Sequence, residues 1–352
     1  MLSVYAFTTY RVALRTHRQN RGQKPAANAS LRSERLVDPV RWLTLEIDKC
    51  DPENAFGDGM KKSNWYYLYR LVRWRLGDRS PVVASLKVTQ NCNLSCTHCP
   101  WKNKIHTDLS TEQWKRIIEQ VRNWGCTLVT FEGGEPTLRP DLQELIDYGS
   151  ELGLSTLVVT NGTRDVTNVT PDRIWVSIEG LEKANDQIRG HGNFKKAFET
   201  LKKNQKKSIV TLTTISKTNY QDIEQMCETL SPYVHGFIFS FLYPYEDTKD
   251  QALSPPERRM VAERILALKK RYDILNSASF LKVVGKGWKC YAWALICATA
   301  DGRFQDGCMV RHLEPCNCEA CDMACYGELA QAMDLKTDAL RFFYDAAGTV
   351  HS

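Results

Sequence analysis

Three cysteines on one short loop constrain this chain more than any other feature. Cys92, Cys96 and Cys99 are spaced C-x3-C-x2-C and follow an apolar run, residues 82–88, that is typical of a buried strand. Thiolates are soft ligands that suit iron–sulfur clusters or zinc. Structural zinc usually takes paired cysteines and closes all four coordination positions. Three thiolates can instead hold three corners of a four-iron cluster and leave the fourth iron open for chemistry.

A second motif follows another predicted strand. Gly133, Gly134 and Glu135 lie within the stretch 131–136. Because glycine has no Cβ, two glycines let the backbone approach a ligand closely and take unusual dihedral angles. Alone, this stretch would indicate a surface turn. Its place after a strand, in a chain with the cysteine loop, favours a binding role.

Together the two motifs resemble those of the radical S-adenosylmethionine (SAM) enzymes. The resemblance covers about residues 82–326 and implies that Cys92, Cys96 and Cys99 ligate a [4Fe–4S] cluster whose open iron is chelated by SAM. It also implies reductive cleavage of SAM to a 5′-deoxyadenosyl radical, which abstracts a hydrogen atom from an unactivated carbon. His98 takes the place where the family usually has an aromatic ring, and we expect it to pack against the cluster or the adenine.

Several further residues are candidates to hold SAM. The resemblance implies that Glu135 accepts a hydrogen bond from the SAM ammonium, which is a charge-assisted contact. Arg189 lies in a stretch similar to a recurrent Asp-x-Ile-Arg-Gly stretch of the family and could pair with the SAM carboxylate; an ion pair on a helix face is the alternative. Ser177 and Glu179 follow the fourth predicted strand, where the family often binds the ribose or methionine part of SAM, and a solvated strand end is the alternative. Candidates from position alone are Asn161 and Thr214.

From residue 82 onward, predicted strands alternate with predicted helices. The first of these helices begins with a capping-box-like stretch at 110–113, and the helix after the fourth strand is predicted as a single long one that includes residues 194–201. The six predicted strands are 82–88, 127–131, 155–159, 174–178, 209–215 and 236–241. Such alternation predicts parallel strands joined by right-handed crossovers. The fold class is therefore α/β, with the partial (β/α)6 barrel of the TIM type that the resembled family has. In such barrels the chemistry sits at the carboxyl ends of the strands, where both motifs fall.

A second group of cysteines resembles the twitch or SPASM extension of radical SAM enzymes, which binds auxiliary iron–sulfur clusters. We predict one auxiliary [4Fe–4S] cluster rather than two, because the usual longer spacer between the last cysteine pairs is missing. The preferred ligands are Cys290, Cys308, Cys321 and Cys325, with Cys318 or Cys316 able to replace one of them. Zinc is the alternative, since four thiolates suit it equally well. We expect Cys50, Cys126 and Cys227 to be buried apolar residues, and the role of Cys297 is left open.

The chain is expected to have five parts. They are a disordered basic arm (1–40), an N-terminal helical segment (41–80), the partial barrel (81–285), the auxiliary-cluster extension (286–330) and a C-terminal helix or tail (331–352). The basic arm overlaps in composition with organellar transit peptides. Within the helical segment, aromatic and aliphatic residues at helical spacing alternate with arginines. This pattern predicts a helix at the barrel rim or, alternatively, an interfacial helix at a membrane surface.

Composition narrows the classes of partner. Thirteen cysteines without a convincing secretory signal favour a reducing compartment over a disulfide scaffold. The net charge of +6 would help docking to an acidic electron donor, a small protein of the flavodoxin or ferredoxin type, and does not indicate specific nucleic-acid binding. We expect a cytoplasmic protein, with peripheral membrane contact through residues 65–76 or an organellar location as alternatives.

The sequence therefore predicts a radical SAM enzyme whose substrate is a lipid or a peptide. Residues 1–80 lack the alternating strands of a peptide-recognition module, and the segment 65–76 favours a lipid. The segment 239–245 is apolar enough to line a hydrophobic pocket, and a barrel core explains it equally well. The alternative from another class is a non-catalytic iron–sulfur or zinc protein that carries electrons or binds a partner. That alternative explains the cysteines but gives the two glycines and Glu135 no role.

Overall fold

The computed structural model describes residues 70, 72–101 and 108–347. The chain divides into two compact units, residues 1–50 and 51–352, and all described residues belong to the second. The basic arm, Cys50 and most of the predicted interfacial helix lie outside the described residues, so what the sequence predicts for them stays a prediction. Within the described ranges every helix is too short or too polar to cross a bilayer.

One eight-stranded sheet, in the order β6-β5-β4-β3-β2-β1-β7-β8, forms the centre of the second unit. Its strands are β1 Val83–Thr89, β2 Leu128–Gly133, β3 Ser155–Thr160, β4 Arg173–Ser177, β5 Ile209–Ile215, β6 Gly236–Phe241, β7 Leu295–Ala298 and β8 Phe304–Asp306. Strands β1 to β6 pair in parallel, each with the next along the chain. The predicted α/β partial barrel is therefore confirmed.

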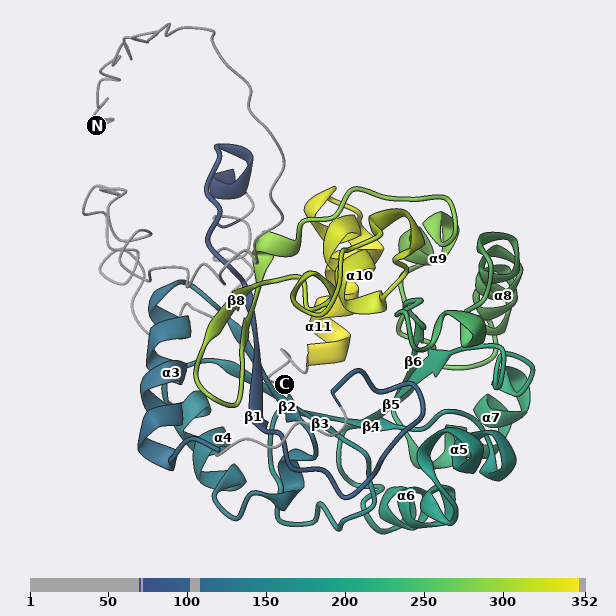
Figure 1. The fold of residues 1–352 in the computed structure, drawn as a ribbon, viewed down its shortest axis with the longest axis horizontal. Helices are drawn as coiled ribbons and strands as arrows, with labels where there is room; N and C mark the ends of the chain where they lie inside the picture. Colours follow the sequence, from purple (N-terminus) through teal and green to yellow (C-terminus); the bar gives the residue numbers. More distant parts are fainter. Residues whose placement is uncertain (1–69, 71, 102–107, 348–352) are drawn as a thin grey trace, which may run out of the picture. The chain divides into compact units, whose positions relative to one another are not determined.

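The helices lie on both sides of this sheet. Figure 1 shows α3 to α8 around the outside of the strands and α10 and α11 within the arc that the strands form. The helices are α3 Thr111–Asn123, α4 Leu142–Glu151, α5 Glu182–Arg189, α6 Asn193–Lys203, α7 Ile223–Leu230, α8 Pro255–Leu268, α9 Ala278–Val283, α10 Ala324–Met333 and α11 Thr337–Ala347. Helix α3 begins with the predicted capping box, in which Ser110 and Gln113 bond to each other's main chain.

Two features differ from the expectation. The single long helix expected after β4 is two helices, α5 and α6, because Gly190 and Gly192 take positive φ angles of 100° and 76° between them. The extension also adds two strands that the sequence did not predict. Strand β7 pairs in parallel with β1, and β8 pairs antiparallel with β7, so the cysteine-rich extension is joined to the barrel through the sheet.

The two faces of the sheet have separate cores. Outward-facing residues such as Leu86, Val129 and Phe131 pack in one core with α3 and α4, and the buried Cys126 lies there as expected. Cys227 is buried in the core beside β4 to β6. Inward-facing residues at the beginnings of β1 and β2 pack instead against Tyr326, Leu329 and Met333 of α10. Helix α10 therefore fills the barrel interior next to the strand beginnings, and the polar inward-facing residues gather nearer the carboxyl ends.

Candidate active site at the carboxyl ends of the strands

The cysteine loop follows the carboxyl end of β1. Cys92 is exposed, Cys99 is half-buried and Cys96 is buried. Burial raises the pKa of Cys96 to about 11, and the nearby guanidinium of Arg189 opposes that rise. The three thiols also act on one another, because the presence of Cys99 raises the pKa of both Cys92 and Cys96. The structure thus brings the three predicted ligands together on one side of the barrel.

These thiols fit an iron–sulfur cluster better than a single metal ion. In the described part of the chain, no three His, Cys, Asp or Glu side chains converge as a single-ion site requires. A cluster does not need such convergence, because each thiolate binds a different iron. The raised pKa of Cys96 means that its thiol would lose its proton only when iron binds.

The two glycines join the second motif to the cysteine loop. Gly133 has a φ of +143°, and a Cβ on it would lie 2.2 Å from the carbonyl oxygen of Thr89. A Cβ on Gly134 would lie 2.2 Å from the carbonyl oxygen of Asn91. In this close packing the Gly134 N–H donates to the Thr89 oxygen at 2.8 Å, and the Glu135 N–H donates to the Asn91 oxygen at 2.8 Å. Glycine is therefore required here for contact between two loops, whereas the sequence had indicated contact with a ligand.

Asp108 also holds the start of the cysteine loop, and the sequence analysis missed it. Its carboxylate accepts hydrogen bonds from the Thr89 hydroxyl at 2.5 Å, the Gln90 N–H at 3.2 Å and the Asn91 side-chain amide at 3.1 Å. Arg139 donates to the carbonyl oxygen just before the end of β1, at 2.9 Å. No motif spacing links these two residues to the loop, because the contacts exist only in the folded chain.

Glu135 is buried and connects the ends of β2 and β3. Its Oε1 accepts hydrogen bonds from the N–H and hydroxyl of Thr137 and from the hydroxyl of Thr160, and its Oε2 accepts one from the Asn161 N–H at 2.7 Å. The Asn161 side chain in turn donates to Asn93 of the cysteine loop at 2.8 Å. A carboxylate oxygen has two lone pairs, so Oε2 retains room for one more donor. That capacity fits the SAM ammonium.

A buried ion pair joins the end of β4 to the end of α5. Arg189 Nη2 lies 2.5 Å from Glu179 Oε1, and the Thr214 N–H donates to Glu179 Oε2 at 2.6 Å. His98 Nε2 lies 3.6 Å from the same carboxylate, and Arg189 Nη1 lies 4.0 Å from Cys96 Sγ. Burial, the largest single effect, lowers the pKa of Arg189, but Glu179 and the nearby Cys96 and Cys99 together raise it above its ordinary value. This pair is buried and is not an ion pair on a solvated helix face.

Arg189 has one donor left over. Its Nε is buried and has no hydrogen-bond partner among the residues that the structure describes. An unpaired buried donor is costly and indicates a missing acceptor. A carboxylate such as that of SAM would fit this position. Ser177, at the carboxyl end of β4, is half-buried and lies on the same face of the strand as Trp175.

A second buried pair, which the sequence analysis did not single out, lies inside the barrel. Lys87 of β1 and Glu132 of β2 are register partners, and Lys87 Nζ lies 3.0 Å from Glu132 Oε1. The Ser85 hydroxyl donates to the same carboxylate oxygen and lies 3.9 Å from Cys297 Sγ. Burial opposes the charge of Lys87, but Glu132 raises its pKa, so the lysine stays protonated. The inward position of every second residue in β1 could have revealed this pair.

The extension gathers its own cysteines. Burial raises the pKa of Cys290 to about 11 and that of Cys325 to about 12. Cys290 is close enough to Cys308, Cys318, Cys321 and Cys325 for their charges to affect one another. Cys316 Sγ lies 3.3 Å from Cys318 Sγ. Six of the seven thiols of the extension, all but that of Cys297, are thus linked to one another in this way, and the choice of four ligands among them stays a prediction.

Aromatic hydroxyls fix the loops that carry these cysteines. The Tyr326 hydroxyl donates to the Gly307 carbonyl at 2.6 Å and accepts from the Met309 N–H at 3.0 Å, on either side of Cys308. The Tyr243 hydroxyl accepts from the main-chain N–H between Cys316 and Cys318 at 2.8 Å. Next to Cys321, Asp322 forms a buried ion pair with Arg258 at 2.9 Å. The loops that carry the cysteines of the extension are therefore held by separate contacts between residues far apart in the chain.

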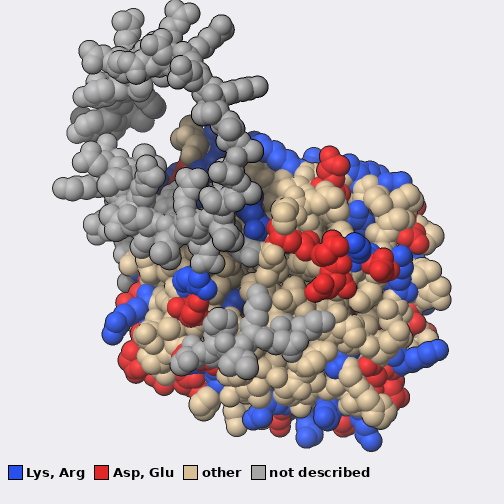
Figure 2. Space-filling model, viewed as in Figure 1, with Lys and Arg blue, Asp and Glu red and all other residues tan. Residues whose placement is uncertain are grey.

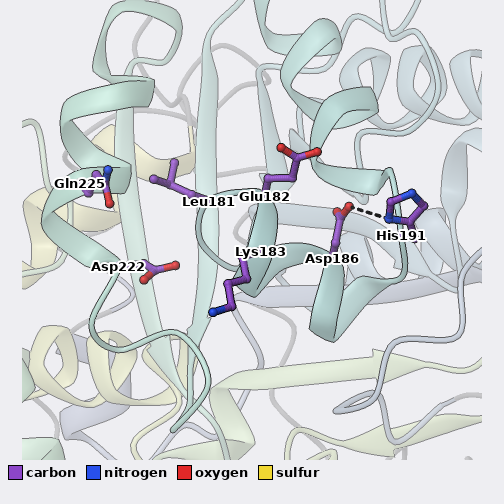
Figure 3. A pocket seen from close by; sticks show the side chains of 7 residues that line it. All are labelled: Leu181, Glu182, Lys183, Asp186, His191, Asp222 and Gln225. Carbon is purple, nitrogen blue, oxygen red and sulfur yellow. Dashed lines mark ion pairs between the residues drawn. The ribbon is translucent and has the colours of Figure 1, made fainter.

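A surface hollow of about 630 Å³ lies elsewhere, beside α5 and α7. Figure 3 shows its side chains, with an ion pair of 3.9 Å between Asp186 and His191. The lining residues are Leu181, Glu182, Lys183, Asp186, His191, Asp222 and Gln225. It includes none of the predicted cysteine, glycine or SAM-binding residues, so we place the active site at the strand ends. On the face seen in Figure 2, acidic and basic side chains of the described residues are intermixed.

Comparison with known proteins finds a family match over the segment that carries both motifs. Residues 86–230 match the family described as the radical SAM superfamily. The chain is 36% identical to Fe-coproporphyrin III synthase of Methanosarcina barkeri over 166 residues, which are 44% of this chain and 41% of that protein. It is 29% identical to the sporulation killing factor maturation protein SkfB of Bacillus subtilis over 160 residues, 42% of this chain and 39% of that protein. The chain thus spans about two fifths of the length of these curated relatives.

Solved structures show the same fold. The structure of Streptococcus suis SuiB bound to the precursor peptide SuiA matches with a TM-score of 0.59 and 17% identity, covering 72% of this chain and 67% of that one. SuiB bound to S-adenosylmethionine matches with a TM-score of 0.58 and 16% identity, covering 76% of this chain and 68% of that one. At such identities the likeness concerns the fold alone. The two motifs and the match over residues 86–230 relate this segment of the chain to the radical SAM superfamily.

Proposed function

We propose that this chain uses a [4Fe–4S] cluster and SAM to abstract a hydrogen atom from a peptide substrate. The observation that carries the proposal is the close packing of Gly133 and Gly134 against the start of the cysteine loop. In support, the buried carboxylate of Glu135 directly follows these glycines, and the guanidinium of Arg189 lies 4.0 Å from Cys96 Sγ. SAM is a sulfonium amino acid, so it needs a cluster to reduce it, a carboxylate for its ammonium and a cation for its own carboxylate.

Each residue would have a distinct role in the site. Cys92, Cys96 and Cys99 would hold three irons of the cluster. Glu135 would accept the SAM ammonium through Oε2, and Arg189 would offer its Nε to the SAM carboxylate while Glu179 keeps the guanidinium in place. The candidates for the ribose or methionine part are Ser177 and Asn161.

When bound, the cluster and SAM supply a 5′-deoxyadenosyl radical by one-electron cleavage of the sulfonium. This chain's residues bind and orient SAM, and the inward side chains of β1 to β7 exclude water from the place where the substrate carbon would lie. Four cysteines of the extension would hold the auxiliary cluster, with Cys290, Cys308, Cys321 and Cys325 preferred and Cys318 or Cys316 as substitutes.

The relatives support a peptide as the substrate. Besides SkfB, they include the mycofactocin maturase MftC of Mycobacterium tuberculosis, 33% identical over 136 residues, and a PqqA peptide cyclase, 32% identical over 126 residues. SuiB, with the same fold, was solved with a precursor peptide. The lipid alternative depends on residues 65–76, of which the structure describes 70 and 72–76, and on the segment 239–245, where Phe239, Phe241 and Leu242 are buried.

A tetrapyrrole is a second candidate substrate. Its support is the 36% identity to Fe-coproporphyrin III synthase and a 30% identity over 164 residues to the AdoMet-dependent heme synthase of Methanosarcina barkeri. An isotope experiment distinguishes the two candidates. A peptide or a tetrapyrrole with deuterium on its carbons is supplied together with SAM, and transfer of deuterium into 5′-deoxyadenosine is measured.

We further propose a flavodoxin- or ferredoxin-type electron donor and a cytoplasmic location, with the net charge of +6 as the support for an acidic donor.

Peripheral membrane contact through residues 65–76 is a separate proposal. Trp74 is buried against Trp293, whereas Leu76 is exposed. Sedimentation with liposomes would test the proposal, and unchanged sedimentation after Trp65→Glu and Leu76→Glu would count against it.

The decisive experiment for the activity is anaerobic reconstitution with iron and sulfide, followed by dithionite and SAM. We expect 5′-deoxyadenosine from the wild type and none from Cys96→Ala. An intact cluster that yields no 5′-deoxyadenosine would instead support a non-catalytic iron–sulfur protein.

A further inference from the structure

The barrel interior contains a charged pair where such barrels normally have aliphatic side chains. Inward-facing strand positions are usually filled by Val, Ile and Leu. Here Lys87 and Glu132 face each other on neighbouring strands near the carboxyl ends. The other cationic residue within the described strands is Arg173, which begins β4 at the opposite end of the barrel.

Stability does not explain this pair. Removing two charges from water costs free energy that their mutual attraction roughly repays, and apolar residues of similar size are often as stable. The outward-facing neighbours on the same strands, Leu86 and Phe131, are fully buried apolar residues. A charged pair in the interior therefore calls for a functional explanation.

The pair is asymmetric, and the carboxylate is the accessible partner. The side chain of Lys87 is 9% exposed and that of Glu132 is 23% exposed. Lys87 and Ser85 both bond to Oε1 of Glu132, and the ring of Trp101 lies 5.8 Å from Lys87 Nζ. Within the described residues, no donor bonds to the other carboxylate oxygen, Oε2. One oxygen is thus fixed and the other is available.

The available oxygen lies beside the place where hydrogen abstraction would occur. Glu132 directly precedes Gly133, which packs on the cysteine loop. Half-buried apolar residues of the next strands, Val159 and Trp175, belong to the interior core that contains α10. A substrate in this space would meet one strong acceptor and an apolar wall.

We propose that Glu132 accepts a hydrogen bond from a neutral amide N–H of the substrate, with Lys87 and Ser85 as positioning residues. A neutral donor fits because the Lys87–Glu132 pair is already neutral, and a third buried charge would cost desolvation. A peptide offers such an N–H at almost every residue. This inference rests on the proposed function and names the contact that would place the peptide beside SAM.

The test compares an amide with its ester. N-methyl-4-methylpentanamide and methyl 4-methylpentanoate have nearly the same shape, and the amide has one N–H donor where the ester has an oxygen and no donor at all. Binding of each to the reconstituted enzyme with SAM is measured by saturation-transfer NMR. We expect the wild type to bind the amide about tenfold more tightly than the ester, as for a hydrogen bond to a charged group.

The test variant is Lys87→Met with Glu132→Met, which removes the acceptor without leaving an unpaired buried charge. We expect it to bind the amide and the ester equally. The matched control is Lys115→Met with Glu144→Met, which makes the same two substitutions in an exposed pair of 2.5 Å between α3 and α4. The control should keep the tenfold preference. Glu132→Gln, which conserves the size of the side chain, should reduce the preference for the amide over the ester several-fold. This variant replaces the double variant in the test if the double variant does not fold.

Two results would overturn the inference: no amide preference in the wild type, or a preference that persists in both the double variant and Glu132→Gln. Formation of 5′-deoxyadenosine without any probe is measured in parallel. If the wild type cleaves SAM but the preference fails, only this inference is wrong. If the wild type does not cleave SAM at all, the proposed function is wrong.

Discussion

The two cysteine regions of this chain are organised in opposite ways. Cys92, Cys96 and Cys99 lie on one short loop, and glycine-mediated packing and Asp108 hold that loop to β1 and β2. The candidate ligands of the extension are distributed over residues 290–325, and their loops depend on separate contacts such as Tyr326 with Gly307. A ligand set on one loop can be recognised from its spacing, whereas a distributed set depends on the fold.

This difference predicts that damage to the first region stops the chemistry and damage to the second mainly affects stability and the auxiliary cluster. The following predictions test that division, from the largest expected effect to the smallest.

The largest effect is expected from losing a ligand of the first loop. Cys96→Ala should reduce 5′-deoxyadenosine formation on the order of a thousandfold or more, because the cluster that delivers the electron loses a ligand. Cys325→Ala should keep SAM cleavage within about tenfold of wild type and lower the bound iron. Product is measured by liquid chromatography and iron per chain by colorimetry. Equal loss in both variants would contradict the division.

Arg258→Met should destabilise the protein by about 3–5 kcal/mol, because it leaves Asp322 buried without its partner. Burial already raises the pKa of Asp322, and Arg258 opposes that rise. Urea unfolding measures the change. The double variant with Asp322→Leu should recover most of the stability, and failure to recover would mean that the ion pair is not the cause.

Gly134→Ala should weaken SAM binding by roughly ten- to a hundredfold, since a Cβ 2.2 Å from the Asn91 oxygen must push the two loops apart. Gly153→Ala is the control, because its φ of +76° makes alanine strained but its Cβ meets nothing within 4 Å. The control should lower stability without changing SAM affinity, measured by equilibrium dialysis. Similar SAM affinities in both variants would count against the loop contact.

The smallest effect is a pH dependence in α10. Burial raises the pKa of Glu328 from 4.5 to about 7, although Ser277 donates to its carboxylate. The folded state therefore binds a proton that the unfolded state has lost between pH 4.5 and 7, so stability should fall as pH rises through that window. Relative to Glu328→Gln, we expect a loss of about 1–3 kcal/mol by pH 8, measured by urea unfolding at pH 5 and pH 8. A pH-independent difference would refute it.

The sequence predicted the barrel well because its signals are local. Strands such as 209–215 and 236–241 were predicted at their observed bounds, since apolar runs bounded by turn residues need no tertiary information. The prediction of one long helix after β4 was wrong because the hydrophobic periodicity gave no sign of a break at the two glycines that separate α5 from α6. Strands β7 and β8 were missed because they are short and form only by pairing with β1 and each other.

By itself, the sequence determined the spacing of Cys92, Cys96 and Cys99, the Gly-Gly-Glu motif and the alternation of strands and helices, because each is a pattern of neighbouring residues. Only the tertiary structure decided why the glycines are required and that Asp108 holds the cysteine loop. It also decided that Glu132 faces the barrel interior, where it pairs with the buried Lys87. Those contacts join residues far apart in the chain, and strand register and loop packing, which set them, exist only once the barrel has formed.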